Sequence, residues 1–197
     1  MDRINISEVL DTGSIPVSGT IIRKLPEYKF DFDRIKQDTL DILEKYNLPQ
    51  IGLTHSAKTL NLSQSDKILD AVGSMYDYDN RKFIADEKDF TIFNEEFKST
   101  SLYEMYQAIP NVGRFRIMTM DSSKCYTFHK DVSMRYHYAI QTNLDCLFLF
   151  PHHRLFYHIP CDKNLYLVDT RKKHSFINGS RTRRIHLVLN DLSSLPK

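Results

Sequence analysis

The sequence predicts an α+β protein in which helices of the first half brace a β barrel or jelly roll formed by the second half. Apolar residues recur at roughly helical spacing before residue 110, whereas from Gly113 onward short aromatic and branched runs alternate with turn residues. Eight such runs with short connections favour a barrel or jelly roll over a doubly wound sheet. The 197 residues suit a single domain, 1–197, in which residues 1–112 support a β core at 113–191.

The first two helices are expected before residue 76. Asp33 is the predicted cap of the first helix, which continues with apolar residues at helical spacing until Pro49 ends it. The second is expected to begin near Ser65. Its predicted buried face consists of Ile68, Leu69, Val72 and Met75.

A third, short helix is expected just before the β region. Ser101 and Glu104 have the spacing of a capping box, and Pro110 follows the predicted end of this helix. Short strands are expected at 50–54 and 91–93, between the helices.

The β region is expected to hold eight strands, separated by turn residues such as the Asn178-Gly179-Ser180 sequence. The predicted strands are 114–120, 124–129, 134–141, 145–150, 154–159, 165–169, 174–178 and 183–189.

Composition and charge exclude several classes of protein. Lys and Arg (27) nearly balance Asp and Glu (25), which excludes a bulk-basic nucleic-acid binder. Three cysteines without a CxxC pair argue against a secreted disulfide framework. The N-terminus lacks an apolar signal segment, and the longest strongly apolar run, 146–150, is far shorter than a membrane span. We therefore expect a soluble, cytoplasmic protein without membrane contact.

Four residues of the β region suggest a metal site with an anion-binding neighbour. His129 and Asp131 lie two positions apart at a predicted strand end, so the period of a strand puts both on one face. His174 opens a later strand, and four intervening β segments would bring it back beside them. Two imidazoles and one carboxylate on one face can hold non-haem Fe(II) with open positions. Arg184, inside a barrel wall, requires a carboxylate partner to be buried at low cost.

These residues resemble the Fe(II)/2-oxoglutarate-dependent oxygenases. The phrases at 135–143 (RYHYAIQTN) and 174–178 (HSFIN), preceded by RFRIMTM at 114–120, are similar to the aspartyl/asparaginyl β-hydroxylase-like branch. The resemblance covers about 113–191. It implies a double-stranded β-helix (cupin-like) core and the decarboxylation of 2-oxoglutarate to succinate and CO₂, coupled to substrate oxidation.

The resemblance also implies roles for individual residues. His129, Asp131 and His174 match the iron ligands and would form the catalytic centre. The cosubstrate 2-oxoglutarate would be bound by Arg184, Arg135 and His137.

Two departures from the animal aspartyl hydroxylases concern the substrate. The spacing from His129 to Arg135 is tighter here, and those enzymes lack the acidic ligand that Asp131 supplies. The presence of Asp131 also argues against a halogenase, which needs that coordination position for halide.

The predicted function is a dioxygenase that uses Fe(II), 2-oxoglutarate and O₂ to hydroxylate an unactivated C–H bond. The substrate would be a protein or peptide side chain, a free amino acid or a similar small metabolite. The alternative is a non-catalytic cupin-type module that binds a metal or ligand. An oxygenase acting on nucleic acid is a weaker rival that rests only on rim charges, and the oligomeric state is left open.

Other basic side chains receive simpler interpretations. His186 shares the parity of Arg184 but is expected to be a hydrogen-bonded core residue, and His152 and His153 are expected in a solvated turn. A basic cluster near the predicted site mouth is expected to be a solvated rim, with binding of an acidic substrate as the alternative. It consists of Arg171, Lys172, Lys173, Arg181 and Arg183.

Overall fold

The computed structural model describes residues 21–59, 63–68, 75–77 and 80–196, and its centre is a sandwich of two antiparallel sheets. The larger sheet has the order β1-β12-β9-β14-β7-β2, and the smaller has the order β11-β10-β13-β8. Two short antiparallel pairs, β3–β6 and β4–β5, form separate two-stranded sheets outside the sandwich. The strands are β1 (Ile22–Leu25), β2 (Gln50–Gly52), β3 (Thr54–His55), β4 (Tyr76–Asp77), β5 (Lys82–Phe83), β6 (Ile92–Phe93), β7 (Val112–Met120), β8 (Lys124–Cys125), β9 (Met134–Gln141), β10 (Cys146–Phe150), β11 (Leu155–Tyr157), β12 (Leu165–Val168), β13 (Ser175–Asn178) and β14 (Arg184–Asp191).

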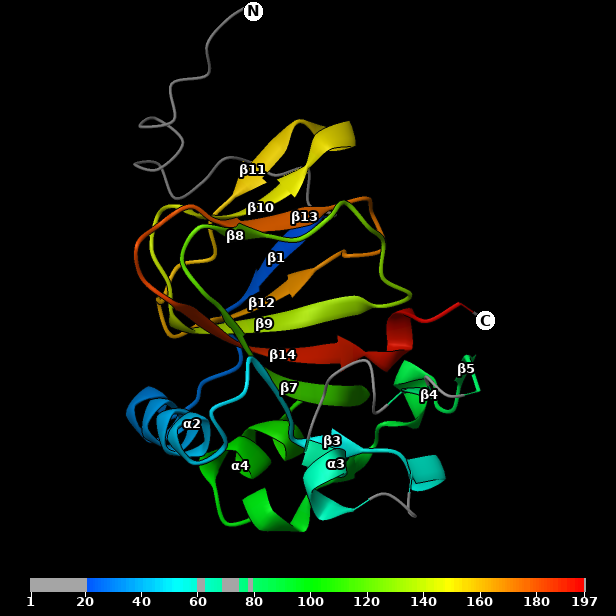
Figure 1. Cartoon of the computed structure of the whole chain (residues 1–197). Coiled ribbons are helices and arrows are strands. Elements are labelled where there is room, and N and C mark those ends of the chain that lie inside the picture. Colours follow the sequence, from blue (N-terminus) through cyan, green and yellow to red (C-terminus); the bar gives the residue numbers. More distant parts are fainter. Residues whose placement is uncertain (1–20, 60–62, 69–74, 78–79, 197) are drawn as a thin grey trace, which may run out of the picture.

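Helices occur mainly before the β region. In Figure 1 the smaller sheet lies at the top, helices α2 and α4 lie at the bottom, and the strands of the larger sheet run between them. The α-helices are α2 (Phe32–Tyr46), α3 (Gln64–Ile68) and α4 (Ser101–Ala108). Short 3₁₀ helices are η1 (Ala57–Thr59), η3 (Glu87–Asp89), η4 (Glu95–Phe97), η5 (Pro151–His153) and η6 (Leu192–Ser194).

The strands from β7 to β14 are distributed over both sheets in the manner of a jelly roll. The larger sheet takes β7, β9, β12 and β14, whereas the smaller takes β8, β10, β11 and β13. All eight predicted strands are present, although β8 ends at Cys125 and is shorter than predicted. Two further strands complete the edges of the larger sheet: β2, which lies within the predicted 50–54 strand, and β1, which the sequence did not predict.

The larger sheet has two faces of different composition, because successive side chains of a strand point to opposite sides. The face that we call outer carries Phe115, Ile117, Leu187 and Leu189, which share one core cluster with Ile35 and Leu102 of the helices. The opposite, inner face meets the smaller sheet, and its apolar part forms a second cluster. That cluster includes Met120, Ala139, Val168, Phe148 and Phe176.

The first helix begins earlier than predicted. Its cap is Asp31, not Asp33, because the Asp31 carboxylate accepts a hydrogen bond from the backbone N–H of Arg34 at 3.2 Å. The helix ends at Tyr46, and Asn47 adopts the left-handed conformation with its N–H bonded to the Leu43 carbonyl oxygen. The helix therefore ends at a C-cap formed by Asn47, two residues before Pro49.

The predicted capping box of α4 is wrong. The cap residue is Thr100, and Ser101 is the first helical residue. Both the backbone N–H and the hydroxyl of Ser101 donate to the Asp38 carboxylate of α2, while Glu104 pairs with Arg34 of the same helix. Because side chains of α2 bind both Ser101 and Glu104, these two residues do not form a capping box within α4.

The second predicted helix is only partly described. It covers Gln64–Ile68, and Ile68 is buried as expected. The predicted positions Leu69 and Val72 lie outside the described residues.

Candidate metal centre

Two distant segments meet where the loop after β8 runs beside the start of β13. His129 and His174 form an antiparallel bridge in which each backbone N–H donates to the other's carbonyl oxygen at 2.9 Å. In such a hydrogen-bonded pair the two side chains lie on the same side of the ladder. The N–H of Asp131 donates to the Thr170 carbonyl oxygen at 2.9 Å, which keeps the loop beside the same segment for two more residues.

The three predicted ligands lie together. The ligand atoms of His129, Asp131 and His174 are all within 4.8 Å of one another. Each imidazole Nε2 is 3.8 Å from an oxygen of the Asp131 carboxylate, and the ring centroids of the two histidines are 4.5 Å apart. The sequence therefore predicted a cluster that the structure contains.

Backbone carbonyls fix the tautomers of both imidazoles. Nδ1 of His129 bonds to the Thr127 carbonyl oxygen at 2.7 Å, and Nδ1 of His174 bonds to the Lys172 carbonyl oxygen at 3.0 Å. Because a carbonyl oxygen only accepts, each Nδ1 carries a proton, so the neutral form of each ring has its lone pair on Nε2. Burial also lowers the pKa of His174, which favours its neutral form. These residues fit a divalent cation bound by two imidazoles and one carboxylate.

Exposure differs across the cluster. The side chain of His129 is 42% exposed, whereas those of Asp131 and His174 are 10% and 5% exposed. The cluster is thus open to solvent on the His129 side and closed on the side of the sandwich interior.

A cavity of about 60 Å³ continues from the cluster into the sandwich. Its polar lining comes from the larger sheet and from the loops beside it, whereas the smaller sheet contributes the aromatic side chains of Phe148 and Phe176. The lining residues are Met118, Tyr126, His129, Asp131, Arg135, His137, Phe148, Thr170, His174, Phe176, Arg184 and Val188.

Arg184 is a buried cation in this cavity. It is 2% exposed, its guanidinium lies 4.0 Å from the centre of the Phe176 ring, and its Nη2 donates to Nδ1 of His186. Its Nε has no hydrogen-bond partner among the described residues, and none of their carboxylates pairs with it. Burial lowers the pKa of Arg184 to about 10, so it remains charged at neutral pH. A buried charge of this kind favours an anionic ligand.

His137 lines the same cavity from β9. Both of its ring nitrogens lack a hydrogen-bond partner among the described residues, and its ring packs edge-on against Phe148 at a centroid distance of 5.0 Å. Burial lowers the pKa of His137 well below its ordinary value, so the ring is neutral. A polar ligand in the cavity would satisfy nitrogen atoms that otherwise cost about 1–3 kcal/mol each.

Arg135 lies between two carboxylates. Its Nη2 is 2.8 Å from Oδ1 of Asp131 and 2.8 Å from Oε1 of Glu87. Its Nε has no partner among the described residues. The cosubstrate role that the sequence suggested for Arg135 stays a prediction, while its observed contacts are with a candidate metal ligand and a second acid.

Glu87 is a site neighbour that the sequence reasoning missed. It lies in the polar run Asp86-Glu87-Lys88-Asp89, which is typical of a solvated loop, yet its side chain is only 10% exposed. The one signal that could have indicated it is electrostatic. Arg114 and Arg135 occur in or beside predicted buried strands and need carboxylate partners.

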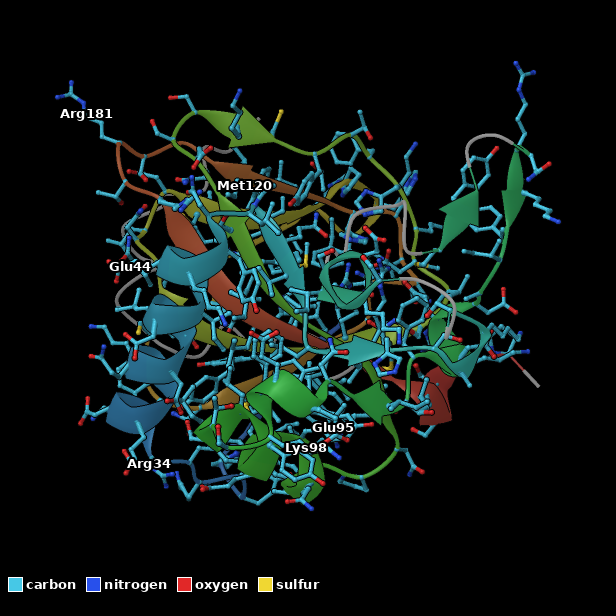
Figure 2. All side chains as sticks on the ribbon, turned by 60° about the horizontal axis from the view of Figure 1, so that its bottom comes forward. Arg34, Glu44, Glu95, Lys98, Met120 and Arg181 are labelled. Atoms are coloured by element: carbon cyan, nitrogen blue, oxygen red, sulfur yellow. The ribbon has the colours of Figure 1, made fainter. Side chains whose placement is uncertain are left out.

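Within the basic cluster that was expected to form a rim, two arginines are paired with carboxylates. Arg171 pairs with Asp169 at 2.7 Å, and Arg183 pairs with Asp121 at 3.0 Å. Arg181 extends away from the body of the molecule (Figure 2). Binding of an acidic partner by this rim stays untested.

Comparisons with known proteins give distant likenesses only. No family model and no curated protein matches the chain. Among solved structures, a cupin domain from Bordetella pertussis Tohama I is 13% identical with a TM-score of 0.35, over 43% of this chain and 85% of that one. An oxidoreductase of the 2OG-Fe(II) oxygenase family from Burkholderia pseudomallei is 15% identical with a TM-score of 0.44, over 86% of this chain and 84% of that one. Within the described residues, every helix is too short or too polar to cross a membrane.

Proposed function

We propose that this chain is an Fe(II)- and 2-oxoglutarate-dependent dioxygenase with a double-stranded β-helix core. The reaction converts 2-oxoglutarate, O₂ and a substrate C–H bond into succinate, CO₂ and a C–OH group. The substrate would be a protein or peptide side chain or a free amino acid. The observation that carries the proposal is the combination of His129, Asp131 and His174 with the buried, carboxylate-free Arg184 in one cavity.

The ligand set supports iron. Two imidazoles and one carboxylate leave further coordination positions open, as the non-haem Fe(II) oxygenases require. Bound iron would supply the activation of O₂ that amino-acid side chains cannot perform. The hydrogen bonds from Nδ1 of both histidines to backbone carbonyls hold each Nε2 toward the ligand position.

The interior of the cavity supports a small dicarboxylate. Arg184 would bind the distal carboxylate, exchanging its hydrogen bond with His186 for a charge-assisted one. His137 would donate to or accept from the same ligand, and Arg135 would donate to it through its free Nε–H. Phe148 and Phe176 exclude water around the guanidinium, which strengthens its attraction for an anion. Because the cavity is about 60 Å³, we expect it to widen when a five-carbon ligand enters.

The test is an anaerobic titration of the metal-free protein with Fe(II) and then 2-oxoglutarate. Wild type should develop the visible charge-transfer band of the chelate. His174→Ala should lose the band because it removes a ligand, and Arg184→Met should require more 2-oxoglutarate to reach it. His153→Ala is the matched control, since that histidine is exposed in η5.

Three results would separate the alternatives. A band in wild type that persists in His174→Ala contradicts the assigned ligands. Metal binding without any band or consumption of 2-oxoglutarate favours the non-catalytic cupin-type module. Turnover with candidate peptides but not free amino acids, or the reverse, identifies the substrate class.

A further inference from the structure

Glu87 contacts three strands of the larger sheet, one of them through the cavity-lining Arg135. Its carboxylate accepts hydrogen bonds from Arg135 of β9 at 2.8 Å, from Asn190 of β14 at 2.5 Å and from the Ser133 hydroxyl at 3.3 Å. Arg114 of β7 lies 3.5 Å from the same carboxylate. A residue at the start of the short helix η3 is therefore fixed from several directions.

Arg135 connects this carboxylate to the candidate metal centre. One guanidinium nitrogen, Nη2, lies 2.8 Å from Glu87 and 2.8 Å from Oδ1 of Asp131. The other oxygen of Asp131, Oδ2, faces Nε2 of His174 at 3.8 Å. A continuous chain of contacts thus runs from Glu87 through Arg135 to a candidate ligand.

We propose that Glu87 is a positioning residue of the metal centre, acting through Arg135 on the carboxylate of Asp131. This inference rests on the metal site of the proposed function. While Glu87 holds Nη2, Arg135 contacts Asp131 through a single oxygen. Without Glu87, the guanidinium is free to close on Asp131 as a bidentate fork, which occupies both oxygens and competes with a metal ion.

Charge balance supports the same role. Arg135 lies between the carboxylates of Glu87 and Asp131, and all three side chains are largely buried. Neutralising Glu87 leaves the positive charge of Arg135 beside Asp131 without this second carboxylate. In a poorly solvated site, that charge opposes the approach of a divalent cation.

The experiment measures the affinity of the metal-free protein for Co(II), a spectroscopic probe, from its visible absorption. Glu87→Gln preserves the shape of the side chain and removes its charge. We expect it to weaken Co(II) binding about 10–100-fold, the usual range for groups that orient metal ligands. A double-mutant cycle with Arg135→Met tests the route. Because Glu87 acts through Arg135, adding Glu87→Gln to Arg135→Met should cause no further loss of affinity.

A matched control separates positioning from general stability. Asn94 is a buried residue of the N-terminal part that bonds to His55 and to the Gly52 carbonyl oxygen, remote in sequence from the ligands. Asn94→Ala should lower the unfolding midpoint and leave Co(II) affinity unchanged. Glu87→Gln should change the affinity and also the visible spectrum of bound Co(II).

The outcomes that would overturn the inference are distinct. If wild type does not bind Co(II), the metal centre itself is wrong. If wild type binds and Glu87→Gln binds equally tightly, or if the double variant loses affinity additively, only the role of Glu87 is wrong. Should Glu87→Gln fail to fold, Glu87→Asp keeps the charge with a shorter reach, and wild-type Co(II) affinity in Glu87→Asp contradicts the proposal.

Discussion

The outer and inner faces of the larger sheet are built from the same strands but differ in the polarity of the side chains that they bury. In β14 all eight residues are buried, yet Ile185, Leu187 and Leu189 pack in the core shared with the helices. Arg184 lines the cavity instead, and His186 accepts a hydrogen bond from it. The outer face buries apolar surface. The inner face, near the candidate metal centre, buries polar groups, several of them without hydrogen-bond partners among the described residues.

The difference teaches which residues stabilise the fold and which are kept for a ligand. Burying apolar side chains is favourable without any ligand. Burying a guanidinium or imidazole without a partner is unfavourable until a ligand supplies one. The comparison therefore predicts that substitutions on the two faces have opposite effects on stability.

The largest expected effect is on the outer face. Phe115 is fully buried, and its ring centroid lies 6.3 Å from that of Phe93 and 6.4 Å from that of Tyr106. Phe115→Ala should lower the free energy of unfolding by about 3–5 kcal/mol, because it leaves a cavity. Urea unfolding of the metal-free protein measures this loss. If folded Phe115→Ala protein also binds Co(II) more weakly than wild type, packing on the outer face affects the metal centre on the inner face.

The strands of the larger sheet are what the sequence predicted best. Runs rich in aromatic and branched residues at 114–120, 134–141 and 183–189 indicated strands, and the structure contains a strand at each position. These signals are local, because each run and its flanking turn residues lie close together in the sequence. The exact ends of helices were less predictable, since Asp38 and Arg34 of α2 supply the partners of Ser101 and Glu104.

On the inner face, the sequence predicted site residues only where their spacing formed a known pattern. His129, Asp131 and His174 formed a recognisable pattern, and the structure gathers them. Glu87 had no such pattern, because its role depends on Arg135 and Asn190, which are 48 and 103 positions away in sequence. Contacts of that kind arise from the topology of the sheet, which no local period encodes.

The second prediction concerns pH. Burial lowers the pKa of His137 and of His186 well below 6.5, whereas in the unfolded chain both take up protons as the pH falls through that value. The unfolded state then binds more protons, so stability is fully present above about pH 6.5 and is lost below it. Between pH 7.5 and 5.5 these two histidines should together lower the free energy of unfolding of the metal-free protein by about 2–3 kcal/mol, near 1.4 kcal/mol per histidine.

Substitutions on the two faces sharpen this prediction. His137→Phe should reduce the acid-induced loss by about 1.4 kcal/mol, because one of the buried histidines that titrate on unfolding is gone. Phe115→Leu, on the outer face, should lower stability equally at both pH values. Urea unfolding at each pH is the measurement. An unchanged pH dependence in His137→Phe would contradict the inferred burial of a neutral imidazole.

The smallest expected effect has the opposite sign. Arg184 is a buried cation without a carboxylate partner among the described residues, so Arg184→Met replaces a costly charge with an apolar chain of similar length. The metal-free protein should gain about 1–2 kcal/mol in urea unfolding while requiring more 2-oxoglutarate. Arg181→Met is the matched control, since Arg181 is exposed and its replacement should change stability by less than about 0.5 kcal/mol.

A clear loss of stability in Arg184→Met would mean that the contacts of Arg184 with His186 and Phe176 outweigh the cost of burying its charge. The inner face would then stabilise the fold as the outer face does, and the contrast between them would not hold.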